Sequence, residues 1–186
     1  MIPAAGEIVH FSEDPTITQF VPHVAATAQR PGAYVWALGP DRAPCYWFPR
    51  QCPRATAWVG DKTTDEDRDR VLGSAADKAR VHAIEYRWLE AMRSTQLYVY
   101  RFAAEAFQPS DDQAVPTAFV ATEPVTPLGP AEPVGELLAL HDDAGIELRV
   151  LSNLWPFWDV VTSSTLEFSG IRLANARPRP WSQAGG

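Results

Sequence analysis

The chain has 186 residues, of which 46% are hydrophobic and 21% charged, and its formal net charge is −7 at pH 7. The length favours one domain, and the acidic balance argues against nonspecific binding to DNA or RNA, which requires a cationic surface. No apolar run is long enough to cross a bilayer, and no N-terminal stretch has the pattern of a signal peptide. We therefore expect a cytoplasmic protein with neither nucleic-acid nor membrane partners, whose oligomeric state the sequence does not define.

Short segments rich in β-branched and aromatic residues predict strands along the chain. They are 7–12, 34–38, 55–59, 97–102, 119–122, 146–151 and 165–173. Residues 81–84 are typical either of a strand or of the entry to a helix. The 17 prolines break the chain into short elements, which disfavours a helical bundle.

Helices are predicted between these strands. Thr64 is a suitable N-cap, and the acids that follow it complement the helix dipole, so a helix is expected to begin there. Amphipathic spacing predicts further helices over 85–93 and 134–143. Residues 43–48 are expected to form a short helix that ends at a proline.

Strands and helices do not alternate as they do in βαβ units, so the pattern predicts the α+β class. We expect a single domain over 1–176, with a bent antiparallel or mixed β-sheet core and two or three flanking helices. Residues 177–186 are rich in Pro, Arg and Gly, and they are predicted to be a disordered tail.

The first predicted strand carries two polar side chains on one face. His10 and Ser12 alternate with Val9 and Phe11, so both should project to the same side. Buried polar groups need partners, which leaves two interpretations open: a pair that orients a ligand, or a strand histidine bonded to a neighbouring loop.

Aromatic and cationic residues follow on the next elements. Tyr34 and Trp36 share a face of the second strand, where they either stack on a heterocyclic ligand or fill the core. Tyr46 and Arg50 lie near a turn bounded by prolines. A guanidinium there could bind phosphate or carboxylate in bidentate fashion, and the alternative is a structural ion pair.

The segment Trp155-Pro156-Phe157-Trp158 is unusually aromatic. Trp155 and Trp158 could close an apolar lid over a ligand, form a protein-interaction patch or plug the core. The segment is expected to be such a lid or a short helix.

Sequence patterns for other sites are missing. Cys45 and Cys52 lack the spacing of a metal site, and Cys52 is expected to be a buried, inert thiol. His82 and Glu85 would share a face of a helix, but no third ligand accompanies them, so no metal site is predicted. No phosphate-binding glycine loop or serine-hydrolase elbow is present.

Eight segments spread over nearly the whole chain carry a resemblance to a known family. They are HFSEDPTITQF, VWA, CYWFPRQCPR, HAIEYRWLEAM, LYVYRF, EPVTPL, AGIELRVL and STLEFSGIRLANA. Through them the chain resembles a family of small uncharacterised bacterial proteins, the DUF6886-type family, which implies no particular activity.

A second resemblance concerns the order of elements: a His-x-Ser strand, a Tyr-bearing strand, an aromatic strand, and a Glu before an apolar strand. This order is similar to the ADP-ribosyltransferase-like fold. The resemblance implies that His10 positions the ribose or carboxamide side of NAD+ and that Tyr34 stacks on nicotinamide. Glu123, or else Glu167, would steady the ribose as the glycosidic bond breaks. The chain departs from that pattern because a proline directly follows Glu123 and no Glu-x-Glu pair exists.

The sequence thus predicts an enzyme or former enzyme that binds a nucleotide-like small molecule. NAD+ is the first candidate, as the substrate of an ADP-ribosyl transfer, and no bound cofactor is indicated. Two alternatives stay open: a non-catalytic binding or interaction module, and a natural-product biosynthetic enzyme with an aromatic-lidded apolar pocket.

Overall fold

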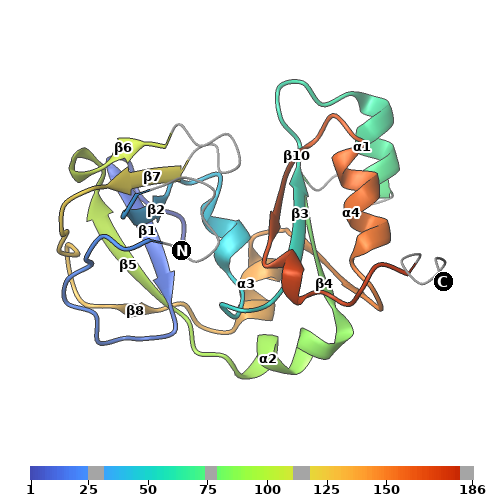
Figure 1. Ribbon diagram of the computed structural model, residues 1–186. Coiled ribbons are helices and arrows are strands. Elements are labelled where there is room, and N and C mark those ends of the chain that lie inside the picture. Colours follow the sequence, from blue (N-terminus) through green and yellow to red (C-terminus); the bar gives the residue numbers. More distant parts are fainter. Residues whose placement is uncertain (25–31, 74–78, 111–117, 181–186) are drawn as a thin grey trace. The chain divides into compact units, whose positions relative to one another are not determined.

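A computed structural model describes residues 1–24, 32–73, 79–110 and 118–180 of the chain (Figure 1). Its strands form antiparallel and mixed sheets with helices beside them, which confirms the α+β class. No helix in these ranges is long and apolar enough to span a membrane.

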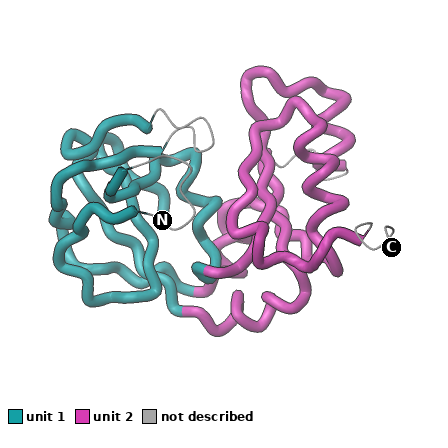
Figure 2. Tube along the Cα trace, viewed as in Figure 1, with its two compact units in different colours: residues 1–50, 96–135 teal, residues 51–95, 136–186 magenta. Residues whose placement is uncertain are grey.

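The chain divides into two compact units, and each unit is assembled from two separate stretches of sequence (Figure 2). Unit 1 comprises residues 1–50 and 96–135, and unit 2 comprises residues 51–95 and 136–186. Each unit has its own sheet, so the predicted core is divided between two sheets.

The sheet of unit 1 is antiparallel, with strand order β6-β7-β2-β1-β5-β8. Its strands are β1 (Glu7–Ser12), β2 (Val35–Leu38), β5 (Tyr98–Ala103), β6 (Gln108–Pro109), β7 (Ala118–Ala121) and β8 (Glu132–Pro133). Both edge strands are two residues long and end in proline, which cannot donate to a ladder, so the edges offer little for further pairing.

One face of this sheet carries the hydrophobic core of unit 1. Phe20 packs against it and makes edge-to-face contacts with Tyr100 and Phe102, at centroid distances of 5.0 and 5.1 Å. Ile8 of β1 and Val35 of β2 belong to the same buried cluster. The 3-10 helix η1 (Ala43–Tyr46) follows β2, where a short helix was predicted.

The sheet of unit 2 has the order β10-β3-β4-β9, and only β4 and β9 run parallel. Its strands are β3 (Arg54–Trp58), β4 (Arg80–Glu85), β9 (Glu147–Leu151) and β10 (Glu167–Ile171). Residues 81–84, for which strand and helix were both open, therefore belong to a strand.

Four α-helices are found in the described part of the chain, all in unit 2: α1 (Asp65–Leu72), α2 (Leu89–Ser94), α3 (Leu137–Asp143) and α4 (Trp155–Thr162). Val71 and Val161 place α1 and α4 against Ala57 and Val81 on one face of the sheet, and the two helices lie side by side in Figure 1. Thr64 caps α1 as predicted, because its hydroxyl accepts from the backbone N–H of Asp67.

The C-terminal residues that the structure describes pack onto unit 2. The backbone N–H of Arg177 donates to the Glu85 carboxylate, and the Arg179 guanidinium pairs with Asp159 at 2.9 Å. The predicted disordered tail covers 177–186, of which residues 181–186 lie outside the described part.

Candidate functional site

His10 lies on β1, directly opposite Tyr100 of β5, and its ring is partly buried. Its Nδ1 atom is 2.9 Å from the backbone oxygen of Trp36 on β2, and the ring meets Phe20 edge-on at 4.9 Å. Because a carbonyl accepts, Nδ1 carries the proton, and the neutral ring keeps an acceptor at Nε2. Nε2 has no hydrogen-bond partner among the described residues.

The surroundings of this imidazole favour its neutral form. Burial lowers the pKa of His10 below its ordinary value, the Trp36 carbonyl opposes that shift, and the charges of Arg50 and His23 lower it further. The ring is therefore neutral near pH 7 and available as a hydrogen-bond acceptor at Nε2.

Arg50 is exposed at the end of the segment that follows η1. Its backbone N–H donates to the Glu13 carboxylate at 2.8 Å, which ties this segment to the residue after β1. The guanidinium itself forms no hydrogen bond or ion pair with any described residue. It remains available to an anion beside His10, and Glu13 is a neighbour that the sequence patterns did not single out.

Ser12 has a structural role in the loop after β1. Its hydroxyl accepts from the backbone N–H of Asp14 at 3.1 Å, and the side chain is buried. The phenol of Tyr100 donates to the oxygen of Asp14 at 2.6 Å and accepts from the N–H of Ile17 at 3.0 Å. Together these bonds fix the loop that leads to Phe20.

Tyr34 and Trp36 are not on the His10 face. Val9 pairs with Leu38, so the alternation of β2 places Trp36 on the Val9 face and Ala37 on the core face. The rings of Tyr34 and Trp36 meet edge-on at 6.0 Å, which keeps them together on the side opposite His10. The structure therefore does not bring the tyrosine ring to the histidine.

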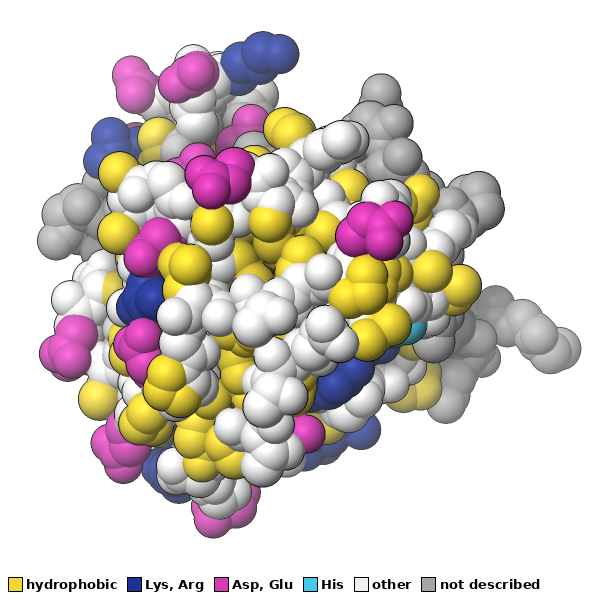
Figure 3. Space-filling view, turned by 90° about the vertical axis from the view of Figure 1, so that its left-hand side faces the viewer, with side chains coloured by type: hydrophobic (Ala, Val, Ile, Leu, Met, Phe, Trp, Pro, Cys, Tyr) yellow, Lys and Arg dark blue, Asp and Glu magenta, His cyan; other side chains and the backbone are white. Residues whose placement is uncertain are grey.

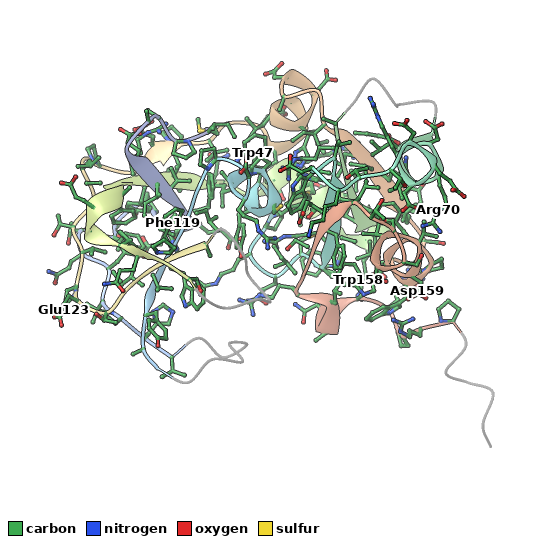
Figure 4. The ribbon with its side chains drawn as sticks, turned by 90° about the horizontal axis from the view of Figure 1, so that it is seen from above. Trp47, Arg70, Phe119, Glu123, Trp158 and Asp159 are labelled. Carbon is green, nitrogen blue, oxygen red and sulfur yellow. The ribbon has the colours of Figure 1, made fainter. Side chains whose placement is uncertain are left out.

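The remaining predicted residues of unit 1 differ in position. Tyr46 is partly buried within η1. Glu123 follows β7 and is exposed, at the outer margin of the unit (Figure 4). On the face that Figure 3 presents, hydrophobic side chains lie between scattered acidic and basic ones, and no single charge dominates.

Glu167, Trp155 and Trp158 belong to unit 2. Glu167 is exposed on β10. The aromatic segment begins helix α4, which was one of the two structures expected for it. Trp158 packs edge-on against Phe168 at 5.6 Å, and the Trp155 indole donates to the oxygen of Arg177 at 2.7 Å. Both tryptophans thus make intramolecular contacts within their own unit.

A buried histidine pair in unit 2 was not predicted. Nδ1 of His82 lies 3.0 Å from Nε2 of His141, although the residues are 59 positions apart in sequence. Three-residue spacing suggested that His82 and Glu85 share a helix face, but both lie on strand β4, where that spacing puts them on opposite faces. The four-residue spacing of His141 from buried Leu137 was the available signal.

Metal and thiol chemistry find no support in the described ranges. No group of three or more His, Cys, Asp or Glu side chains there could hold a metal ion. Cys45 and Cys52 are buried free thiols. Burial raises the pKa of Cys52 to about 12 even though Arg54 acts in the opposite direction, so this thiol stays protonated and unreactive.

Comparison with known proteins identifies the family. The model of DUF6886, a family of unknown function, matches residues 9–176. The chain belongs to this family. Neither the curated proteins nor the solved structures contain a significant match to it. Family membership covers both units and assigns no activity to either.

Proposed function

We propose that unit 1 binds a small anionic, nucleotide-like molecule at His10, with NAD+ as the first candidate. The observation that carries the proposal is that the two ring nitrogens of His10 have different roles. Nδ1 donates to the backbone oxygen of Trp36, and Nε2 is left as a hydrogen-bond acceptor. A nucleotide offers the complementary groups, because its ribose hydroxyls donate and its phosphates are anionic.

Arg50 supports the choice of an anion. Its charge is close enough to act on His10, and its guanidinium has no partner among the described residues. A guanidinium binds phosphate through two parallel hydrogen bonds, which fixes orientation as well as charge. A ribose hydroxyl on Nε2 with a phosphate on Arg50 would satisfy both side chains.

In the catalytic version of the proposal, the nicotinamide–ribose bond of NAD+ breaks and ADP-ribose passes to an acceptor. Nicotinamide leaves with the electron pair of the bond, the acceptor atom bonds to the ribose carbon, and the acceptor proton goes to solvent. A carboxylate stabilises the cationic ribose. Glu123, which belongs to the same unit as His10, is the proposed carboxylate, and the non-catalytic version needs none.

The test is calorimetry with NAD+, ADP-ribose and AMP, accompanied by an assay of nicotinamide release. His10→Asn keeps an amide donor near the position of Nδ1 but removes Nε2, so it should weaken binding by about tenfold or more while the melting temperature changes little. Arg50→Ala should weaken the binding of all three ligands, because each carries phosphate. Arg93→Ala, which changes an exposed arginine on α2, should leave their binding unchanged.

Two outcomes would overturn the proposal. One is that none of the three ligands binds to the wild-type protein. The other is that His10→Asn binds them as well as wild type does. Binding without nicotinamide release would retain the binding module and remove the transferase reaction.

A further inference from the structure

Residues 172–180, here called the C-terminal strap, follow β10 and lie across unit 2. Leu173 and Ala176 pack against the buried cluster of Ala55, Ala83 and Leu154. Leu151, Phe157 and Trp158 pack against the same cluster, so the strap supplies part of its cover. The strap thus completes one end of the unit 2 core.

The polar contacts of the strap begin at a fully buried carboxylate. Glu85 has no exposed surface, and its oxygens accept from the backbone N–H of Arg177 at 3.0 and 3.2 Å. The Arg87 guanidinium donates to the same carboxylate at 3.0 Å and to the oxygen of Asn175. The strap backbone therefore supplies part of the compensation that this buried charge requires.

Side chains of α4 and the residues before it bind the rest of the strap backbone. The Trp155 indole donates to the oxygen of Arg177, and Asn153 donates to the oxygen of Pro178 at 3.0 Å. Arg179 then pairs with both oxygens of Asp159 at 2.9 Å and lies over the Trp155 ring at 4.2 Å. The strap has one short turn of its own, η5 (Leu173–Asn175). The contacts described above between the strap and the rest of unit 2 are made by side chains, as they would be for a docked peptide.

The connection between β10 and the strap is strained. Arg172 has φ 55° and ψ 28°, and it is the one non-glycine residue with positive φ in the described part of the chain. The left-handed region is unfavourable for a residue with a Cβ atom. This conformation occurs at the residue where the strap leaves β10.

We propose that two copies of the chain exchange their C-terminal straps to form a symmetric dimer. Every strap contact described above reforms in trans, since the partner presents the same Glu85, Trp155 and Asp159. Arg172 leaves the left-handed region when β10 continues into an extended hinge, so strain relief favours the exchange. The occupant is a second copy because its strap is the one peptide known to fit.

A pair of charge reversals tests the exchange. Asp159→Arg and Arg179→Asp each place like charges together when the strap binds its own unit or an identical copy. In a mixture of the two proteins, an exchanged heterodimer restores both ion pairs. We expect native mass spectrometry to show the mixed dimer in excess over either homodimer. The double variant carrying both changes restores the pair within one chain and is the control for folding.

The hinge gives a second measurement. Arg172→Pro cannot adopt positive φ and should raise the dimer fraction measured by size-exclusion chromatography with light scattering. Arg172→Gly tolerates positive φ and should lower it. A mixture without heterodimer, or an Arg172→Pro protein that stays monomeric at every concentration, would overturn the exchange.

Discussion

His82 and His141 form a buried imidazole pair whose proton positions can be assigned. Nδ1 of His141 lies 2.7 Å from the oxygen of Leu137, so it carries a proton, and its Nε2 accepts from Nδ1 of His82. This arrangement requires His141 to be neutral, because a protonated His141 would have no acceptor at Nε2, and burial, which lowers the pKa of His82, keeps the second ring neutral as well. Unit 2 therefore links the charge state of two histidines to its packing.

The first prediction is a loss of stability in mild acid. Burial lowers the pKa of both rings from 6.5, and the electrostatic effects of His141, Arg80 and Arg54 lower that of His82 further. The unfolded chain thus binds protons that the folded chain excludes, and stability falls as the pH drops below 6.5. Each imidazole should contribute a slope of about 1.4 kcal/mol per pH unit in urea titrations.

A matched pair of variants separates this effect from the other histidines. His82→Asn keeps a donor toward His141 and cannot titrate, so its slope between neutral and mildly acidic pH should be shallower. His10→Asn removes the buried histidine of unit 1, whose pKa burial also lowers, and so measures its share of the slope separately. Equal slopes for wild type and His82→Asn would contradict the assignment.

Tyr100 leads to the second prediction. Its phenol joins Asp14 to Ile17, so Tyr100→Phe removes one donor and one acceptor while keeping the ring in the core. We expect the free energy of unfolding to fall by about 1–2 kcal/mol. Tyr98→Phe is the control, since that phenol makes no hydrogen bond with the described residues. The idea fails if both variants lose the same stability.

The strands were predictable because each is a local pattern. Alternation and β-branched content located β1, β2, β5 and β9 to within a residue or two of their observed bounds. A local pattern does not indicate which strands pair with one another in a sheet. Residues 51–95, which belong to unit 2, separate the two stretches of unit 1, so segments that are adjacent in sequence belong to different sheets.

The candidate site shows the same limit. The sequence placed His10 and Ser12 on one face of a strand, and the structure has them there. Tyr34 was grouped with them because it lies on the next strand, but the single pair Val9–Leu38 sets a register that turns its ring to the other face. A register depends on contacts between strands, which a single-strand pattern does not report.

The third prediction concerns the buried charge of unit 2. Glu85→Ala leaves the N–H groups of Arg177 and Leu154 without their acceptor, while the freed guanidinium of Arg87 is partly exposed and regains water. We expect a loss of about 2–4 kcal/mol from the two orphaned donors. Glu90→Ala, at an exposed position on α2, should change stability by less than about 0.5 kcal/mol. Comparable losses for the two variants would show that the Glu85 contacts contribute nothing.

The fourth prediction concerns the close contact of the strap with β10. A Cβ atom on Gly170 would lie 2.6 Å from the Trp158 ring and 2.7 Å from the side chain of Leu173. The Trp158 ring is held edge-on by Phe168, so it cannot swing away without losing that contact. Gly170→Ala should therefore lower the free energy of unfolding by about 1–3 kcal/mol, the usual cost of overpacking a core.

Gly129→Ala is the control for Gly170→Ala, because a Cβ atom there meets nothing within 4 Å and the backbone does not have positive φ. It should leave stability within about 0.5 kcal/mol of wild type or raise it slightly by restricting the unfolded chain. Urea titrations of both variants give the comparison. If Gly170→Ala proves as harmless as Gly129→Ala, then Leu173 moves aside freely, and the strap is held by its polar contacts rather than by its fit against Trp158.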